Sequence, residues 1–173
     1  MTTPESLVEA ASLEGTVWVR VIGRGTFGVS PGLKKFIHAR LAQGEKRFVI
    51  DLLDCEIMDS TFMGTLASFA LKIIDTEGGF IEVINANDRT ASLLGNLGLS
   101  QIFKVRRAGD PDAPHVPGEE HMESAATEGA SKSEATDTAL SAHEALVEID
   151  SANASRFRDV LDYLREASQE NNS

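Results

Sequence analysis

Residues 47–74 read RFVIDLLDCEIMDSTFMGTLASFALKII and contain a strand, its exit loop and a long helix. Positions 48–53 are apolar at nearly every residue, which is typical of a strand in the middle of a sheet. Beyond the loop, apolar residues recur at spacings of four, three and four, which predicts a helix over about residues 60–76. A buried strand followed by an apolar helix indicates an α/β layer.

Two hydroxyl residues, Ser60 and Thr61, lie where this helix is expected to begin. Backbone N–H groups at a helix N-terminus lack partners within the helix, and the helix dipole is positive there, so a phosphate on either residue would be stabilised. Asp and Ser are also ordinary capping residues, and Asp59 is placed to cap the helix. The geometry alone fits both a phosphorylation switch and simple capping.

The segment resembles the signature of STAS domains, the family of bacterial anti-sigma factor antagonists. A member typically has an apolar strand with Asp, a short loop and then Asp-Ser-Ser/Thr-Gly-Leu-Gly-Val-Leu. The residues that match this pattern are Asp59, Ser60, Thr61, Gly64 and Leu66. Met63 is a mild substitute for Leu, whereas Phe62 and Thr65 depart from Gly and Val.

The resemblance implies a regulatory binding module. In the family, the unphosphorylated antagonist binds a serine-kinase anti-sigma factor and frees sigma, and the kinase resets the switch with its own ATP and magnesium. Carried over by motif position, the phosphoacceptor is Ser60, with Thr61 as the second choice. The implied partner-binding patch consists of Asp59, Ser60, Thr61, Phe62, Met63 and Gly64. A phosphate of about −1.5 to −2 charge beside Asp59 and Glu56 would weaken a complex with an acidic or apolar partner face.

Phe62 leaves a second function open. Its bulky ring stands where the family has Gly, and it can either point into the core or block the approach of a kinase. The second arrangement would leave a non-switching STAS scaffold or adaptor protein.

Charge and hydropathy exclude several other classes. The 173 residues carry 16 Lys and Arg against 27 Asp and Glu, a net charge of −11, which disfavours nucleic-acid binding. No apolar run approaches the roughly 20 residues that span a bilayer, and residues 1–13 lack signal-peptide character. We therefore expect a cytoplasmic protein that binds neither nucleic acid nor membrane. Cys55 is the only cysteine, so it is expected to be a small filler residue.

No residue pattern predicts an enzyme, a cofactor or a metal site. Ser60 lacks the Gly-x-Ser-x-Gly elbow of a hydrolase, and no histidine is near it in the sequence to act as its base. The histidines without a metal-ligand spacing are His38, His115, His121 and His143. The acids that crowd the strand and its exit loop are Asp51, Asp54, Glu56 and Asp59. Such a group can bind magnesium, but it more often consists of solvated loop residues.

The order of elements predicts a STAS-like domain over residues 1–107. Residues 6–11 and 16–22 are expected to form an opening hairpin, and Ser30-Pro31 is expected to start the first helix. Further strands are predicted at 80–84 and 101–105, with a short helix between them. The expected fold is α/β: a mixed sheet of about five strands packed with helices, followed by a C-terminal helical extension.

The C-terminal third divides into two parts. Residues 108–137 are rich in Pro, Gly, Ser and acids, which predicts a flexible acidic linker. Residues 138–170 form a helical segment with apolar residues at helical spacing: Leu140, His143, Val147, Phe157, Val160, Leu161 and Leu164. We expect these helices to fold back onto the same chain. A homodimer or a grip on another protein is the alternative, because a long linker allows either.

Overall fold

The computed structural model describes residues 6–172, so the first five residues of the predicted domain and Ser173 lie outside the described part. The elements up to the sixth strand are β1 (Leu7–Leu13), β2 (Thr16–Gly25), α1 (Ser30–Ala42), β3 (Arg47–Asp51), β4 (Cys55–Met58), α2 (Ser60–Ile74), β5 (Phe80–Ala86), α3 (Asp88–Asn96), η1 (Leu99–Gln101) and β6 (Lys104–Arg107). The remaining elements are η2 (Glu119–His121), β7 (Glu123–Thr127), α4 (Lys132–Ile149), α5 (Ala152–Arg156) and α6 (Arg158–Asn171).

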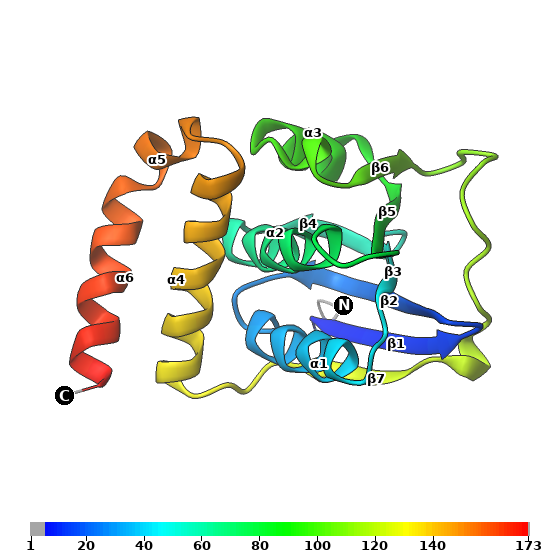
Figure 1. Ribbon diagram of the computed structural model, residues 1–173, viewed down its shortest axis with the longest axis horizontal. Helices are drawn as coiled ribbons and strands as arrows, with labels where there is room; N and C mark the ends of the chain where they lie inside the picture. Colours follow the sequence, from blue (N-terminus) through cyan, green and yellow to red (C-terminus); the bar gives the residue numbers. More distant parts are fainter. Residues whose placement is uncertain (1–5, 173) are drawn as a thin grey trace, which may run out of the picture.

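One mixed, seven-stranded sheet organises the chain, with strand order β6-β5-β3-β2-β1-β7 and β4 paired to β2. β2, β3, β5 and β6 run parallel to one another, while β1 pairs antiparallel with both β2 and β7. Helices α1, α2 and α3 lie along the sheet, and α4 and α6 form a further layer outside them (Figure 1). The fold is the expected STAS-like α/β arrangement.

The alternation of β2 decides which of its faces meets the core. Val17, Val19 and Val21 are fully buried, as the alternation predicts, and they pack in one cluster with residues of α1 and α2. Helix α2 is apolar around most of its circumference, and ten of its residues are buried. A helix of this kind needs cover on more than the side that faces the sheet.

Two strands were not predicted. β4 lies in the expected exit loop and pairs with β2, where Met58 is opposite Gly25. β7 lies inside the expected linker and pairs with β1, where Ala126 is opposite Val8. The strand count of about five was therefore too low, because both strands are short and β7 has the unremarkable sequence ESAAT. The division into three domains by sequence stays a prediction.

The C-terminal helices pack on the same chain, which confirms the expected intrachain docking. α4 crosses α1 and α2, and α6 lies beside α4 (Figure 1). Helix α4 begins at Lys132, six residues before the predicted start at 138. Of the apolar residues at helical spacing, Leu161 and Leu164 are buried and Val160 is 41% exposed. Leu140, Val147 and Phe157 are half-buried, so the docking covers part of this apolar stripe.

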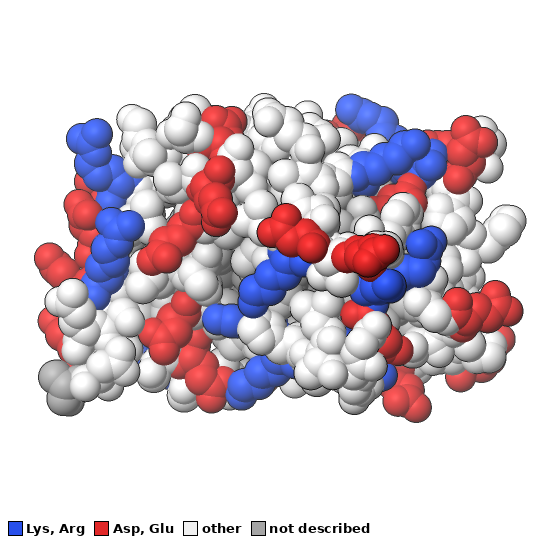
Figure 2. All heavy atoms as spheres, viewed as in Figure 1, with Lys and Arg blue, Asp and Glu red and all other residues white. Residues whose placement is uncertain are grey.

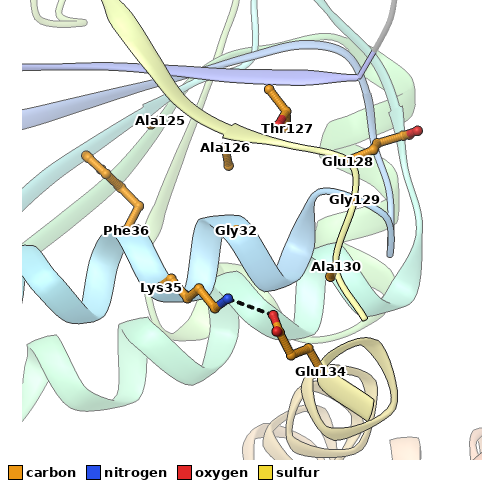
Figure 3. Close-up of a pocket in the computed structure, with 10 residues that line it drawn as sticks. All are labelled: Gly32, Lys35, Phe36, Ala125, Ala126, Thr127, Glu128, Gly129, Ala130 and Glu134. Carbon is orange, nitrogen blue, oxygen red and sulfur yellow. Dashed lines mark ion pairs between the residues drawn. The ribbon is translucent and has the colours of Figure 1, made fainter. Parts of the chain in front are cut away.

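A short strap joins β7 to α4 beside α1. Gly32 of α1 allows β7 to approach closely, since a Cβ atom at this position would lie 2.9 Å from the Cβ of Ala126. A hollow of about 520 Å³ lies between these elements. Lys35 Nζ lies 2.7 Å from Glu134 Oε2, and Figure 3 shows this ion pair at the lower edge of the hollow. β7 therefore fixes the point from which the C-terminal helices start.

Candidate functional site

Asp59 caps α2 and anchors a neighbouring loop. Its Oδ1 accepts a hydrogen bond from the Phe62 backbone N–H at 2.8 Å, the usual side-chain cap of a helix. Its Oδ2 accepts from the Phe27 N–H at 2.7 Å. The capping role suggested by the sequence is confirmed, and both carboxylate oxygens are occupied within the chain.

Ser60 is the first residue of α2, and its hydroxyl contacts a histidine from the C-terminal extension. Ser60 Oγ lies 2.9 Å from His143 Nε2, and His143 Nδ1 lies 2.7 Å from the Ala139 carbonyl oxygen. A carbonyl oxygen can only accept, so Nδ1 donates to Ala139. In the neutral ring Nε2 is then the acceptor, and the Ser60 hydroxyl donates to it.

The imidazole of His143 is held from a second side. The ring of Phe157 meets it edge-on, with ring centroids 4.9 Å apart and an interplanar angle of 75°. His143 is only 3% exposed, while Ser60 is half-buried. The hydroxyl that the sequence predicts as phosphoacceptor is thus covered by α4 in this conformation.

Phe62 points into the core. It is fully buried, and its ring lies against Gly25, where an added Cβ would come within 2.7 Å of the ring. Of the two arrangements that the sequence left open, the structure has the one in which the ring is away from the surface. The Phe-for-Gly difference therefore places no bulky group in front of Ser60.

The rest of the predicted patch is also covered. Thr61 is 8% exposed and Met63 is 3% exposed. A Cβ atom on Gly64 would lie 2.7 Å from the carbonyl carbon of Ala142 and 2.8 Å from its Cβ, so the two helices touch backbone to backbone there. Of the six predicted patch residues, Asp59 and Ser60 are half-buried and the others are buried or covered by α4.

His143 is the site residue that sequence reasoning missed. It is 83 positions from Ser60 in the chain, and only the packing of α4 on α2 brings the two together. One signal was present in the sequence, because His143 falls in the apolar stripe of its helix. An ionisable side chain on such a face needs a hydrogen-bonding partner when it is buried.

The crowded acids do not converge on Ser60. Asp51 is buried and accepts from the amide of Asn85 at 2.8 Å, with Arg20 Nε 3.5 Å from its other oxygen. Asp54 and Glu56 are exposed. Among residues 6–172, no three His, Cys, Asp or Glu side chains are grouped so that they could hold a metal ion.

Two titratable groups outside the site have shifted pKa values. Burial raises the pKa of the Cys55 thiol to about 11, which fits a filler residue rather than a reactive thiol. The pKa of His38 on α1 is lowered, first by burial and then by Lys72 and Lys34. Figure 2 shows Lys and Arg interspersed with Asp and Glu over the face in view.

The fold agrees with comparisons to known proteins. The STAS domain model matches residues 8–109, so the chain belongs to the STAS domain family. No curated protein matches it. The matched part ends before β7, and α4 with His143 therefore lies outside it.

Two solved structures with TM-scores of 0.50 and 0.52 show the same fold at low identity. A crystal structure of a putative anti-sigma factor antagonist from Thermotoga maritima is 20% identical, with a TM-score of 0.50 over 58% of this chain and 86% of that one. An NMR structure of the protein TM1081 is 19% identical, with a TM-score of 0.52 over 62% and 82%. The unphosphorylated anti-sigma factor antagonist SpoIIAA is 13% identical over 65% and 91%, with a TM-score of 0.48.

No helix in residues 6–172 is both long enough and apolar enough to cross a membrane.

Proposed function

We propose that this STAS protein is a regulatory binding module of the anti-sigma factor antagonist type, switched by phosphorylation of Ser60. A serine-kinase anti-sigma factor is the proposed partner and kinase. Thr61 is the second choice of acceptor, and the surface from Asp59 to Gly64 is the proposed docking patch. The protein acts by binding rather than by catalysis, it needs no cofactor of its own, and it works in the cytoplasm.

The observation that carries this proposal is the position of Ser60. It is the first residue of α2, directly after the capping residue Asp59, within the part of the chain that matches the STAS model. Free backbone N–H groups and the positive end of the helix dipole favour a phosphate at this position. Phe62 does not stand in the way, because its ring is fully buried.

Phosphopeptide mapping of the protein from its native host tests the proposal. We expect one added phosphate per chain, on Ser60, when a serine-kinase anti-sigma factor is active. Ser60→Ala should lose this phosphate while Thr61→Ala keeps it. A phosphate on neither residue, under conditions where the kinase modifies another antagonist, would contradict the switch.

The second candidate is a constitutive STAS scaffold, and one observation favours it. The hydroxyl of Ser60 is already engaged by His143, and α4 covers the neighbouring residues. If this cover is permanent, the protein binds partners through other surfaces and is never phosphorylated. A partner complex whose affinity is the same for wild type and Ser60→Asp supports the scaffold.

A further inference from the structure

Helix α4 lies on the face of α2 that contains the proposed switch. His143 of α4 contacts Ser60 in the first turn of α2, and the neighbouring residue Ala142 lies against Gly64, one turn further along α2. These two contacts span the residues that the proposed partner would have to reach. The C-terminal extension therefore competes with any partner for the same surface.

The side chains that α4 buries are mostly small. They are Thr138, Ala142, His143, Ala145 and Leu146, with Leu146 the only large aliphatic residue among them. The opposite side of α2 consists of large residues that are fully buried in the main core: Phe62, Leu66, Phe69 and Ile73. Because apolar stabilisation scales with buried area, these small side chains contribute less than the large core residues do. Ala145 and Leu146 join the edge of the same apolar cluster, so α4 extends the core.

The chain is anchored at β7, just before α4, and a short segment that contains Gly129 connects the two. β7 is hydrogen-bonded to β1 and packs on Gly32, so the chain is anchored up to Thr127. Gly129 has φ +131° and nothing within 4 Å of a Cβ position, a conformation that an L residue rarely adopts. Beyond it, the Lys35–Glu134 ion pair is solvent-exposed, and such pairs stabilise weakly (Figure 3).

We infer that α4, α5 and α6 form a removable internal cover, which swings away about residues 128–131 before a kinase or partner reaches Ser60. The inference rests on the proposed function and adds its regulation. The covered face fits a partner helix that presents a small residue opposite Gly64, since Ala142 occupies that place in the closed chain.

Gly64 gives a way to lift the cover without disturbing the core. In Gly64→Ala the new methyl group would overlap the Ala142 backbone, so α4 must move, whereas α2 itself gains a better helix former. Gly95→Ala is the matched control, because Gly95 also lies in a helix and has nothing within 4 Å of its Cβ position. Both variants keep Ser60 and His143.

Hydrogen exchange on the full chain provides the first readout. We expect Gly64→Ala to exchange at least tenfold faster than wild type over residues 132–149, with β3 and β5 unchanged, and Gly95→Ala to match wild type. If α4 keeps its protection in Gly64→Ala, or if α4 and the strands lose protection together, the helix is not a separable cover and the inference is overturned.

Phosphorylation kinetics provide the second readout, with the serine-kinase anti-sigma factors of the native host, ATP and magnesium as the reagents. Because Gly64 belongs to the proposed docking patch, the kinetics use Ala142→Leu, which enlarges the same contact from α4 and leaves the patch unchanged. We expect Ala142→Leu to be modified on Ser60 at least several-fold faster than wild type and Gly95→Ala. Equal rates for an Ala142→Leu protein whose α4 is shown by hydrogen exchange to be released would overturn the cover and leave the proposed switch standing. No phosphate on any variant, including one with α4 released, would refute the switch and its regulation together.

Discussion

Helix α2 is covered from two sides, and the two covers differ in chemistry. Toward the main core it presents large apolar side chains, among them Phe62 and Phe69, which are fully buried. Toward α4 it presents Ser60 and Gly64, which make a side-chain hydrogen bond and a close backbone contact. At 3.6 residues per turn these two sets lie on opposite sides of the helix.

The difference shows that burial alone does not tell whether a contact is permanent. Both sides of α2 exclude water, but the core side buries the larger apolar side chains, which would otherwise be hydrated. The α4 side combines the close contact at Gly64, the Ser60–His143 hydrogen bond and a smaller apolar contact through Ala145 and Leu146. The core face should therefore determine the stability of the domain, and the α4 face should determine access to Ser60.

The largest expected effect comes from the core face. Phe69→Ala should lower the free energy of unfolding by about 3–5 kcal/mol, because it leaves a cavity among fully buried residues. Urea denaturation followed by circular dichroism measures this. A loss below about 1 kcal/mol, in the range of ordinary surface substitutions, would remove the contrast between the two faces.

The second largest effect on stability is expected at Asp59, which caps α2. Asp59→Ala removes the acceptor for two backbone N–H groups, those of Phe62 and Phe27, and should cost about 1–2 kcal/mol. Ser131→Ala, which removes the cap of α4, is the comparison because its hydroxyl accepts only from Glu134. Asp59→Ala should lower the free energy of unfolding measured by denaturation. Ser131→Ala should instead raise the hydrogen-exchange rate of α4.

A smaller effect is expected at the hydroxyl of Ser60. Ser60→Ala leaves His143 Nε2 without its partner and should weaken the closed state of α4 by about 1 kcal/mol, or roughly fivefold in exchange rate. The same substitution at Ser68 is the control, since that hydroxyl bonds only to the Thr65 carbonyl of its own helix. Identical exchange of α4 in the two variants would mean that the Ser60–His143 bond contributes nothing to closure.

The smallest effect depends on pH. The pKa of Glu134 is lowered from 4.5, first by its hydrogen bond to Lys35 and then by the charge of Lys35. A carboxyl whose folded-state pKa is depressed stabilises the folded chain above the unfolded pKa and loses this contribution as the pH falls through the folded pKa. Wild type and Glu134→Gln should therefore differ slightly in α4 exchange at pH 6 and converge once the pH has fallen below the lowered pKa of Glu134. A difference that persists at low pH would exclude the ion pair as its cause.

The elements that the sequence predicted well are those with a strong local pattern. The apolar run at 48–53, the helix after Asp59 and the opening hairpin all follow from periodicity and turn residues within one short window. Residues 123–127 have no such pattern, because β7 is specified by pairing with β1 rather than by its own composition. Residues 123–127 therefore form a strand because of their tertiary contacts and not because of a local sequence pattern.

The sequence predicts the Asp59-Ser60-Thr61 part of the candidate site but not the contact with His143. The Asp59-Ser60-Thr61 motif and its helix start can be read from adjacent residues, and the structure places them as expected. The contact with His143 cannot, because it joins residues 83 positions apart and depends on the crossing of α2 and α4. The all-round apolar character of α2 was the local sign that a second cover exists.

β7 also determines where the chain can be shortened. It occupies the outer position beside β1, so a protein that ends at Arg107 would expose the unpaired N–H and C=O groups of β1 along one border of the sheet. Exposed borders of this kind recruit strands from other molecules, and the shortened protein should self-associate. A protein that ends at Gly129 keeps β7 in place and removes only α4, α5 and α6. Aggregation of the protein that ends at Arg107 would result from the loss of β7. Only the protein that ends at Gly129 measures what α4, α5 and α6 contribute to stability.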